Sequence, residues 1–392
     1  MNQQKKIIAV LLCAVFFLSA CSSDKVPKPT VWGRFQEPFK SVELSPDSGI
    51  DEITIVWQKN LPGDSLNRYA QLAPAFTKNS VVAATPSGNI RSIELASSEI
   101  NWATNLDSSI SFAVGVGGKI AVVGHSNGYV TALNIDTGDI KWTSAIKYQI
   151  SAIPAVSMDA VVIRTSDGRI IGLDPHDGNQ RWILETERPR LTMQGDSQPT
   201  LQQDIMLIGL GNGKLIVGNS ITGRLDWEIY IGNIGGRNDI DRINDVDSPP
   251  ILNGSTAYAA AFRGYIKSIN MNSAETIWET QYSTRLPMSL GKKNIYAVSD
   301  LGELAAFDIE TGAIAWNQDM FRGHGMSPPV TIDGRVLVGD SKGRLHSLDP
   351  LSGQLIDTQE LFSGAVLAII ENGQSAAVYT SQNELALIDI QN

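Results

Sequence analysis

Residues 121–142 read AVVGHSNGYVTALNIDTGDIKW, and this stretch decides the fold. It contains an apolar run, a turn that ends at Gly128, an alternating run, a second turn at Asp136-Thr137-Gly138, and a segment that carries Trp142. Asn-Gly and Thr-Gly place a residue that tolerates positive φ where a hairpin reverses direction. The pattern therefore predicts three short strands joined by two tight turns.

The same unit recurs along the chain. A turn glycine precedes a tryptophan by fourteen residues in six pairs, which are Gly88 and Trp102, Gly128 and Trp142, Gly168 and Trp182, Gly213 and Trp227, Gly264 and Trp278, and Gly302 and Trp316. A seventh copy starts at Gly343 but has Asp357 where the tryptophan belongs, and an eighth starts at Asn383 without a last strand. Successive copies begin 40, 40, 45, 51, 38, 41 and 40 residues apart. A period near 40 residues with several short strands is typical of a β-propeller.

The N-terminal part of the chain supplies a strand for the incomplete eighth copy. Residues 53–60, ITIVWQKN, carry Trp57 with no glycine turn before it. Pairing this strand with the C-terminal unit would close the ring and leave no open outer edge. We therefore expect an all-β fold, an eight-bladed β-propeller of four-stranded blades over residues 53–392, with seven blades as the alternative.

The repeated residues have structural explanations within such a ring. We expect the tryptophans to fill the space between adjacent blades. The turns at Asp136, Asp308 and Asp349 are expected to let each aspartate accept backbone N–H groups while a glycine takes the left-handed conformation.

Residues 1–20 have the pattern of a secretory signal. Lys5 and Lys6 precede an apolar run that ends in Leu18-Ser19-Ala20-Cys21. This ending resembles a bacterial lipobox, which implies cleavage before Cys21 and acylation of that cysteine; an ordinary signal peptide or a short membrane anchor is the alternative. Ser22, in place of the aspartate that retains lipoproteins at the inner membrane, favours the outer membrane and its periplasmic side. Residues 21–52 hold four prolines without sustained periodicity, so we expect a flexible tether.

Composition narrows the range of functions. Cys13 lies in the signal and Cys21 would be acylated, so the domain itself has no thiol for a disulfide or a thiolate metal site. The formal net charge of −10 argues against binding nucleic acid. The four histidines make no metal-ligand spacing, so we expect no metal and no cofactor.

Two junctions between repeats are longer than the others. Trp182 to Pro199 spans 17 residues and Trp227 to Pro249 spans 22, whereas Trp142 to Pro154 spans 12. The first presents Leu191 and Met193 among polar residues, and the second is rich in aspartate with Arg237 and Arg242 interspersed. Both join an outer strand to the next inner strand, so they should leave the ring on one face, where a partner is expected to dock. The alternatives are an aspartate-rich loop that only caps its own turn, and a calcium site, although the spacing does not match an EF-hand loop.

The ending D-x-x-T/S-G-x-x-x-W resembles the tryptophan-docking repeat of pyrroloquinoline quinone dehydrogenases. That resemblance implies the scaffold, but those enzymes hold their quinone near adjacent cysteines, which this chain lacks. We therefore expect that this protein is not an enzyme. A quinone-dependent dehydrogenase and a generic periplasmic binding propeller are the alternatives.

Over nearly its whole length the chain resembles the BamB family, lipoprotein propellers of the outer-membrane β-barrel assembly machinery. The resemblance implies a scaffold that binds the periplasmic POTRA domains of BamA, reaches the other subunits through BamA, and offers unfolded barrel strands a site for strand addition. It assigns partner binding to Leu191, Met193, Gln194, Arg242, Asp245 and Asp247. Gln194 departs from the arginine that is common in the family, which removes one charge-assisted contact.

Overall fold

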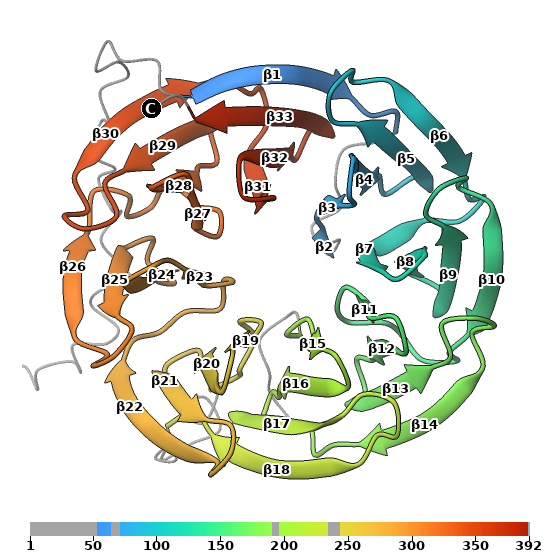
Figure 1. Ribbon diagram of the computed structural model, residues 1–392, viewed down its shortest axis with the longest axis horizontal. Coiled ribbons are helices and arrows are strands. Elements are labelled where there is room, and N and C mark those ends of the chain that lie inside the picture. Colours follow the sequence, from blue (N-terminus) through green and yellow to red (C-terminus); the bar gives the residue numbers. More distant parts are fainter. Residues whose placement is uncertain (1–52, 64–70, 190–195, 234–243, 391–392) are drawn as a thin grey trace, which may run out of the picture. The chain divides into compact units, whose positions relative to one another are not determined.

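The computed structural model describes residues 53–63, 71–189, 196–233 and 244–390. These residues form eight antiparallel sheets arranged as blades around a central axis (Figure 1), which confirms the predicted eight-bladed propeller. Each blade has four strands. In blades 1 to 7 the strands follow chain order from the axis outward, blade 8 takes its outer strand from the start of the described chain, and blade 2 gains a fifth strand from β2 (Gln71–Leu72).

The strands of the first four blades, from inner to outer, have the following bounds: β3 (Ala75–Phe76), β4 (Ser80–Ala84), β5 (Asn89–Glu94) and β6 (Ile100–Asn105) in blade 1; β7 (Ile110–Gly117), β8 (Ile120–His125), β9 (Tyr129–Asn134) and β10 (Ile140–Ala145) in blade 2; β11 (Ala155–Val156), β12 (Val161–Arg164), β13 (Arg169–Leu173) and β14 (Gln180–Glu185) in blade 3; β15 (Thr200–Gln202), β16 (Ile205–Gly209), β17 (Lys214–Asn219) and β18 (Leu225–Tyr230) in blade 4.

The remaining blades follow the same order: β19 (Ile251–Asn253), β20 (Thr256–Ala260), β21 (Tyr265–Asn270) and β22 (Glu275–Gln281) in blade 5; β23 (Ser289–Leu290), β24 (Asn294–Val298), β25 (Leu304–Asp308) and β26 (Ile314–Gln318) in blade 6; β27 (Val330–Ile332), β28 (Arg335–Gly339), β29 (Arg344–Leu348) and β30 (Leu355–Glu360) in blade 7; β31 (Val366–Glu371), β32 (Ser375–Thr380), β33 (Glu384–Ile390) and β1 (Ile53–Asn60) in blade 8.

Blade 8 is completed by the two ends of the described chain. β1 pairs antiparallel with β33, from Ile53 opposite Ile390 to Asn60 opposite Glu384. This pairing confirms the predicted closure. Because β1 supplies the outer strand that β33 would otherwise lack, the outer edge of that blade is built like the others.

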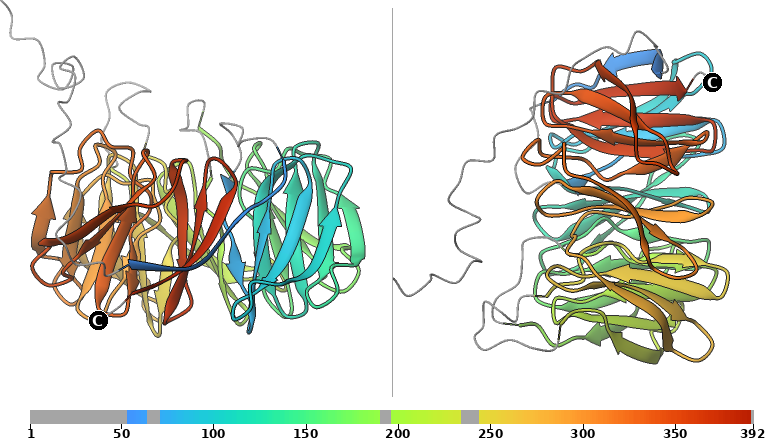
Figure 2. Two further views of the ribbon diagram at one scale, coloured as in Figure 1. Left: turned by 90° about the horizontal axis from the view of Figure 1, so that it is seen from above. Right: turned by 90° about the vertical axis from the view of Figure 1, so that its left-hand side faces the viewer.

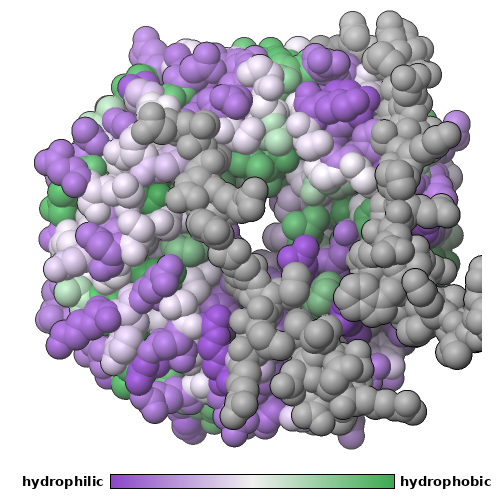
Figure 3. Space-filling model, turned by 180° about the vertical axis from the view of Figure 1, so that it is seen from behind, coloured by the Kyte–Doolittle hydropathy of each residue, from purple (hydrophilic) through white to green (hydrophobic). Residues whose placement is uncertain are grey.

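The strands alternate in direction, so the ring has two distinct faces (Figure 2). The turns between second and third strands, and the junctions from one blade to the next, lie on one face, which we call the junction face. The turns between first and second strands and between third and fourth strands lie on the opposite face. A hollow lies around the axis of the ring (Figure 3). Inner strands of several blades line it with apolar residues such as Val114, Val156 and Leu201.

The tryptophans of the repeat join neighbouring blades, as predicted. The indole Nε1 of six of them donates to a backbone carbonyl in the third-to-fourth-strand turn of the next blade at 2.8–3.0 Å. The donor and acceptor pairs are Trp57 to Leu95, Trp102 to Ile135, Trp142 to Pro175, Trp182 to Ser220, Trp278 to Ile309, and Trp316 to Pro350. Each bond fixes one blade against its neighbour.

Blade 7 has an aspartate at the position that a tryptophan occupies in the other repeats. Asp357 occupies the position and is buried, with its carboxylate accepting from the backbone N–H of Thr358 and from the amide of Gln359. The next blade is blade 8, whose third and fourth strands come from opposite ends of the chain. A tryptophan at position 357 would therefore have no connected turn on which to dock.

The prediction for the turns needs one correction. Asp308 and Asp349 accept backbone N–H groups as expected. In blade 2, however, the acceptor is Asn134, which receives the N–H groups of Asp136 and Thr137. Asn134 stands four residues before the turn glycine, as Asp308 and Asp349 do, so Asp136 was the wrong position.

Replacing Gly178 with alanine should destabilise the ring by crowding a docked tryptophan. A Cβ on Gly178 would lie 2.5 Å from Cε3 of Trp142. Gly254 has a similar positive φ, 59° against 72°, but a Cβ there would meet no atom within 4 Å. We expect Gly178→Ala to lower the free energy of unfolding by about 1–3 kcal/mol more than Gly254→Ala, because overpacking adds to the shared backbone strain. Urea unfolding of both variants measures the difference, and equal losses would contradict the docking role.

Candidate functional site

The two long junctions leave the ring side by side on the junction face. The first connects β14 to β15 and the second connects β18 to β19, so they belong to consecutive blade boundaries. Leu191, Met193, Gln194 and Arg242 lie outside the described residues. Asp245 and Asp247 are described. The described parts of each junction, which we call its stems, are residues 186–189 and 196–199 in the first and residues 231–233 and 244–250 in the second.

The stem of the second junction is threaded into the ring between blades 4 and 5. The backbone N–H of Val246 donates to the carbonyl of Leu210 at 3.1 Å, and the carbonyl of Asp245 accepts from the N–H of Phe262 at 2.8 Å. Gly209 is required at this crossing, because a Cβ there would collide with the carbonyl of Val246. The side chain of Asp245 is consequently 0% exposed.

Asn244 closes the neck of the same junction. Its Nδ2 donates to the carbonyl of Asn233 at 2.6 Å, across eleven positions of the chain. Gly213 and Gly232 leave room for its side chain, since a Cβ at either position would approach it within 3 Å. The two described ends of the second junction, Asn233 and Asn244, are therefore held together.

Arg164 ties the first junction to the ring. It ends β12, its side chain is only 5% exposed, and it donates to Oδ1 of Asp196 at 3.0 Å and to the carbonyl of Ser197 at 3.1 Å. It also donates to the carbonyl of Gly209 in blade 4. A planar guanidinium can serve several acceptors at once, which a lysine cannot do with the same geometry.

The two stems also touch one another. The hydroxyl of Ser197 donates to the carbonyl of Ser248 at 3.4 Å, and both serines are buried. Through Arg164 and this contact, blade 3, the stems of both junctions and the edge of blade 4 are connected by hydrogen bonds. We call Arg164, Asp196, Ser197, Asn244, Asp245 and Asp247 the junction base.

The junction base concentrates buried charge. Burial, together with the nearby carboxylates of Asp245 and Asp196, raises the pKa of Asp247 to about 8, although Arg164 and Arg285 act in the opposite direction. Asp247 is therefore largely protonated at neutral pH. A neutral carboxyl group reduces the repulsion among the three aspartates.

Sequence reasoning missed Arg164, Asp196 and Asn244. A signal for Arg164 was present, because it is a charged residue directly after the apolar run Val161-Val162-Ile163. Asp196 and Asn244 carry no comparable signal, since their partners are distant in the chain or belong to the backbone. Conversely, Asp245 is fully buried, and Asp247 is half-buried with one carboxylate oxygen shielded from solvent. A contribution of Asp245 to partner binding would therefore pass through the shape of the junction.

No group of histidine, cysteine or acidic residues suited to a metal ion occurs within the described ranges. His125 and His346 instead lie at hydrogen-bond distance from Thr131 and Thr358, 2.9 Å in each case. Among those same ranges there is also no helix long and apolar enough to cross a membrane.

Replacing Asp247 with asparagine should change how stability depends on pH. The pKa of Asp247 is about 8 in the folded protein and about 3.9 in an unfolded chain, so the folded state holds the additional proton between these values. Stability contributed by this group is thus lost as the pH rises from about 4 to 8, with a slope of up to about 1.4 kcal/mol per pH unit. Asp247→Asn should flatten that slope, as measured by urea unfolding across this range. The exposed Asp159→Asn serves as the control, and identical slopes in all three proteins would contradict the assignment.

Comparison with known proteins identifies the family of this chain. The family model "Outer membrane protein assembly factor BamB" matches residues 88–318 and 302–392. A curated protein of that description from Legionella pneumophila (strain Paris) is 38% identical over 324 residues, which cover 83% of this chain and 84% of the relative. Its counterpart from Pseudomonas aeruginosa is 38% identical over 334 residues, covering 83% of this chain and 88% of the relative.

A solved structure agrees with the sequence matches. The crystal structure of BamB from Moraxella catarrhalis superposes with a TM-score of 0.78 at 26% identity and covers 86% of this chain and 100% of that one. The quinone-dependent dehydrogenase alternative is therefore set aside. The chain belongs to the BamB family of outer membrane protein assembly factors, which are not enzymes.

Proposed function

We propose that this protein is a lipid-anchored scaffold of the outer-membrane β-barrel assembly complex, and that it binds the POTRA domains of BamA through its junction face. Family membership supports the assembly role. The observation that carries the binding site is the junction base, in which Arg164 and Ser197 hold two consecutive junctions together. A rigid scaffold that presents neighbouring loops is the usual arrangement for a docking site.

The proposed roles divide between contact and support. Leu191, Met193, Gln194 and Arg242 are proposed to touch the partner. Asp245 and Asp247 are proposed to support the second junction from within, because Asp245 is fully buried and Asp247 lies beside it in the same stem.

Anchoring is proposed to come from acylated Cys21 in the outer membrane, on the periplasmic side. Two or more acyl chains give stable attachment without a spanning helix. The other assembly subunits would be reached through BamA. Client strands remain a further proposed partner, and the parallel pairing of β2, a segment of the chain itself, with the inner strand β7 supports strand addition at an inner edge.

The contact residues are tested by capture from the native envelope. We expect Leu191→Ala with Met193→Ala and Arg242→Ala to reduce BamA recovery at least tenfold in a mild-detergent pull-down, because an apolar pair and a cation are lost. Circular dichroism and urea unfolding should match the unchanged protein. Full recovery of BamA by the folded variant would reject this face as the docking site.

Arg164→Gln tests the supporting role. The variant removes a buried guanidinium from three acceptors, so we expect the free energy of unfolding to fall by about 2–4 kcal/mol. At a temperature below its unfolding midpoint, where the variant is still folded, we expect weaker BamA capture. Arg181→Gln is the matched control, since Arg181 forms a partly exposed ion pair with Asp174 in blade 3, away from the junction base. If both variants capture BamA equally, the junction base does not serve docking. If the unchanged protein captures no barrel subunit at all, a binding propeller for another ligand becomes the better conclusion.

A further inference from the structure

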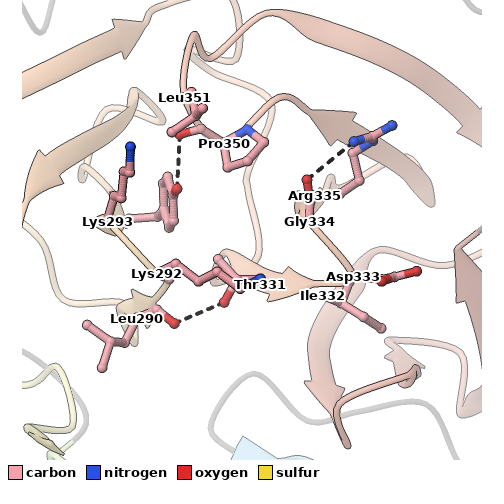
Figure 4. A pocket seen from close by; sticks show the side chains of 12 residues that line it. Leu290, Lys292, Lys293, Thr331, Ile332, Asp333, Gly334, Arg335, Pro350 and Leu351 are labelled. Carbon is pink, nitrogen blue, oxygen red and sulfur yellow. Dashed lines mark hydrogen bonds between the residues drawn. The ribbon is translucent and has the colours of Figure 1, made fainter. Parts of the chain in front are cut away.

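A second concave site lies on the opposite face, between blades 6 and 7 (Figure 4). It is a cavity of about 530 Å³, formed by the turn between β23 and β24, the turn between β27 and β28, and the turn that follows β29. That volume is in the usual range for small-molecule sites in proteins. The BamB assignment and the junction face leave this cavity without a role.

The floor of the cavity is apolar and held in place. Tyr296 and Ile332 are each 2% exposed, and Leu290 and Pro350 complete the lining. The carbonyl of Pro350 accepts from Oη of Tyr296 at 2.9 Å and from Nε1 of Trp316 at 3.0 Å. These bonds, with the bond from Oγ1 of Thr331 to the carbonyl of Leu290 across the two blades, form the floor before any ligand arrives.

The rim of the cavity is cationic. Lys292 and Lys293 extend from one turn and Arg335 from the other, so that Lys293 and Arg335 stand on opposite sides (Figure 4). Both lysines are exposed, and neither makes an ion pair with another residue of the described chain. Asp333 contributes a carboxylate and Asp349, in the Pro350 turn, interacts with Arg335, so the three basic side chains still leave an excess of positive charge in a chain with a net charge of −10. Such a rim selects an anion, and the floor beneath it favours an apolar group attached to that anion.

The cavity shares its face with the start of the propeller. Ile53 pairs with Ile390 at the end of the third strand of blade 8, which is where third-to-fourth-strand turns lie in the other blades. The Pro350 turn of blade 7 occupies the same face. Residues 21–52 precede Ile53, so the proposed acyl anchor joins the ring on the side of the cavity. Leu351, at the mouth, is 60% exposed.

We propose that this cavity binds the headgroup region of an anionic phospholipid. The lipid phosphate is held by Lys292, Lys293 and Arg335, and its glycerol and first methylene groups cover the accessible apolar surface of Leu290, Pro350 and Leu351. Basic side chains near an anionic membrane surface attract it over about one Debye length, so the site acts once the tether has brought the ring close. The inference rests on the proposed membrane anchoring, and it adds a specific lipid contact to it.

The test uses the full-length acylated protein in phosphatidylcholine vesicles that carry a photoreactive phosphatidylglycerol or, in parallel, a photoreactive phosphatidylcholine. We expect phosphatidylglycerol to label peptides with residues 290–296, 331–335 or 350–351, as read by mass spectrometry. Lys292→Glu with Lys293→Glu should reduce that labelling at least tenfold. Lys78→Glu with Lys119→Glu is the matched control, because both lysines are exposed in first-to-second-strand turns on the same face. This control should label as the unchanged protein does.

Three results would overturn the proposal: equal labelling by both lipids, an equal loss in both double variants, or labelling only outside the cavity. Binding of an acidic peptide to the cavity, with no lipid labelling there, would also overturn it and assign the site to a protein partner. Failure of the anchor itself is seen separately, because the protein would then not sediment with vesicles. BamA capture by the Lys292 and Lys293 variant should be unchanged, which separates this site from the junction face.

Discussion

The pairing of β1 with β33 is the constraint on which the rest of the structure depends. Each blade of a propeller contacts only its two neighbours, so an open array would leave one blade exposed at each end. Here the strand that begins at Ile53 is joined to the strand that ends at Ile390, and the first and last parts of the propeller become one sheet. The Trp57 indole then docks on blade 1 and extends the closure from one blade to the next. The absence of tryptophan at Asp357 is the counterpart of this arrangement, because the blade that closes the ring lacks a connected turn to receive one.

Closure gives the junctions a rigid support. The turns and short junctions serve the ring, whereas the two long junctions extend beyond what closure requires. Their stems are held by buried polar groups: an arginine that serves three acceptors, an asparagine that joins both ends of one junction, and two aspartates, one fully buried and one half-buried. Buried charge is costly unless it is paired or neutralised, and both solutions are present, in the Arg164 to Asp196 ion pair and in the raised pKa of Asp247. Such a base maintains a shape more than it adds stability.

The two faces of the ring differ in chemistry because they carry different connections. The junction face carries the two long junctions and the junction base with its three aspartates. The opposite face has short turns, so its features come from single residues at turn tips, such as the paired lysines of blade 6 and the arginine of blade 7. The described part of the propeller begins on this opposite face, at Ile53, so the two proposed contacts use different faces of the ring.

The sequence by itself determined the repeat, the blade number, the closing strand and the inter-blade role of the tryptophans. These features depend on local turn chemistry and on spacing within one unit, so each copy of the repeat confirmed the others. The one error in these turns concerned the acceptor: the sequence predicted Asp136, and the structure has Asn134, two residues earlier in the same turn. Only the tertiary structure decided that Asp245 is buried, that Arg164 reaches a junction more than thirty residues away, and that turns of blades 6 and 7 enclose a cavity. The physical reason is that these properties arise where neighbouring blades meet. Burial and charge coupling at such boundaries depend on residues that no periodicity brings together, and a pattern of aspartates reads the same whether the carboxylates face a partner or the interior.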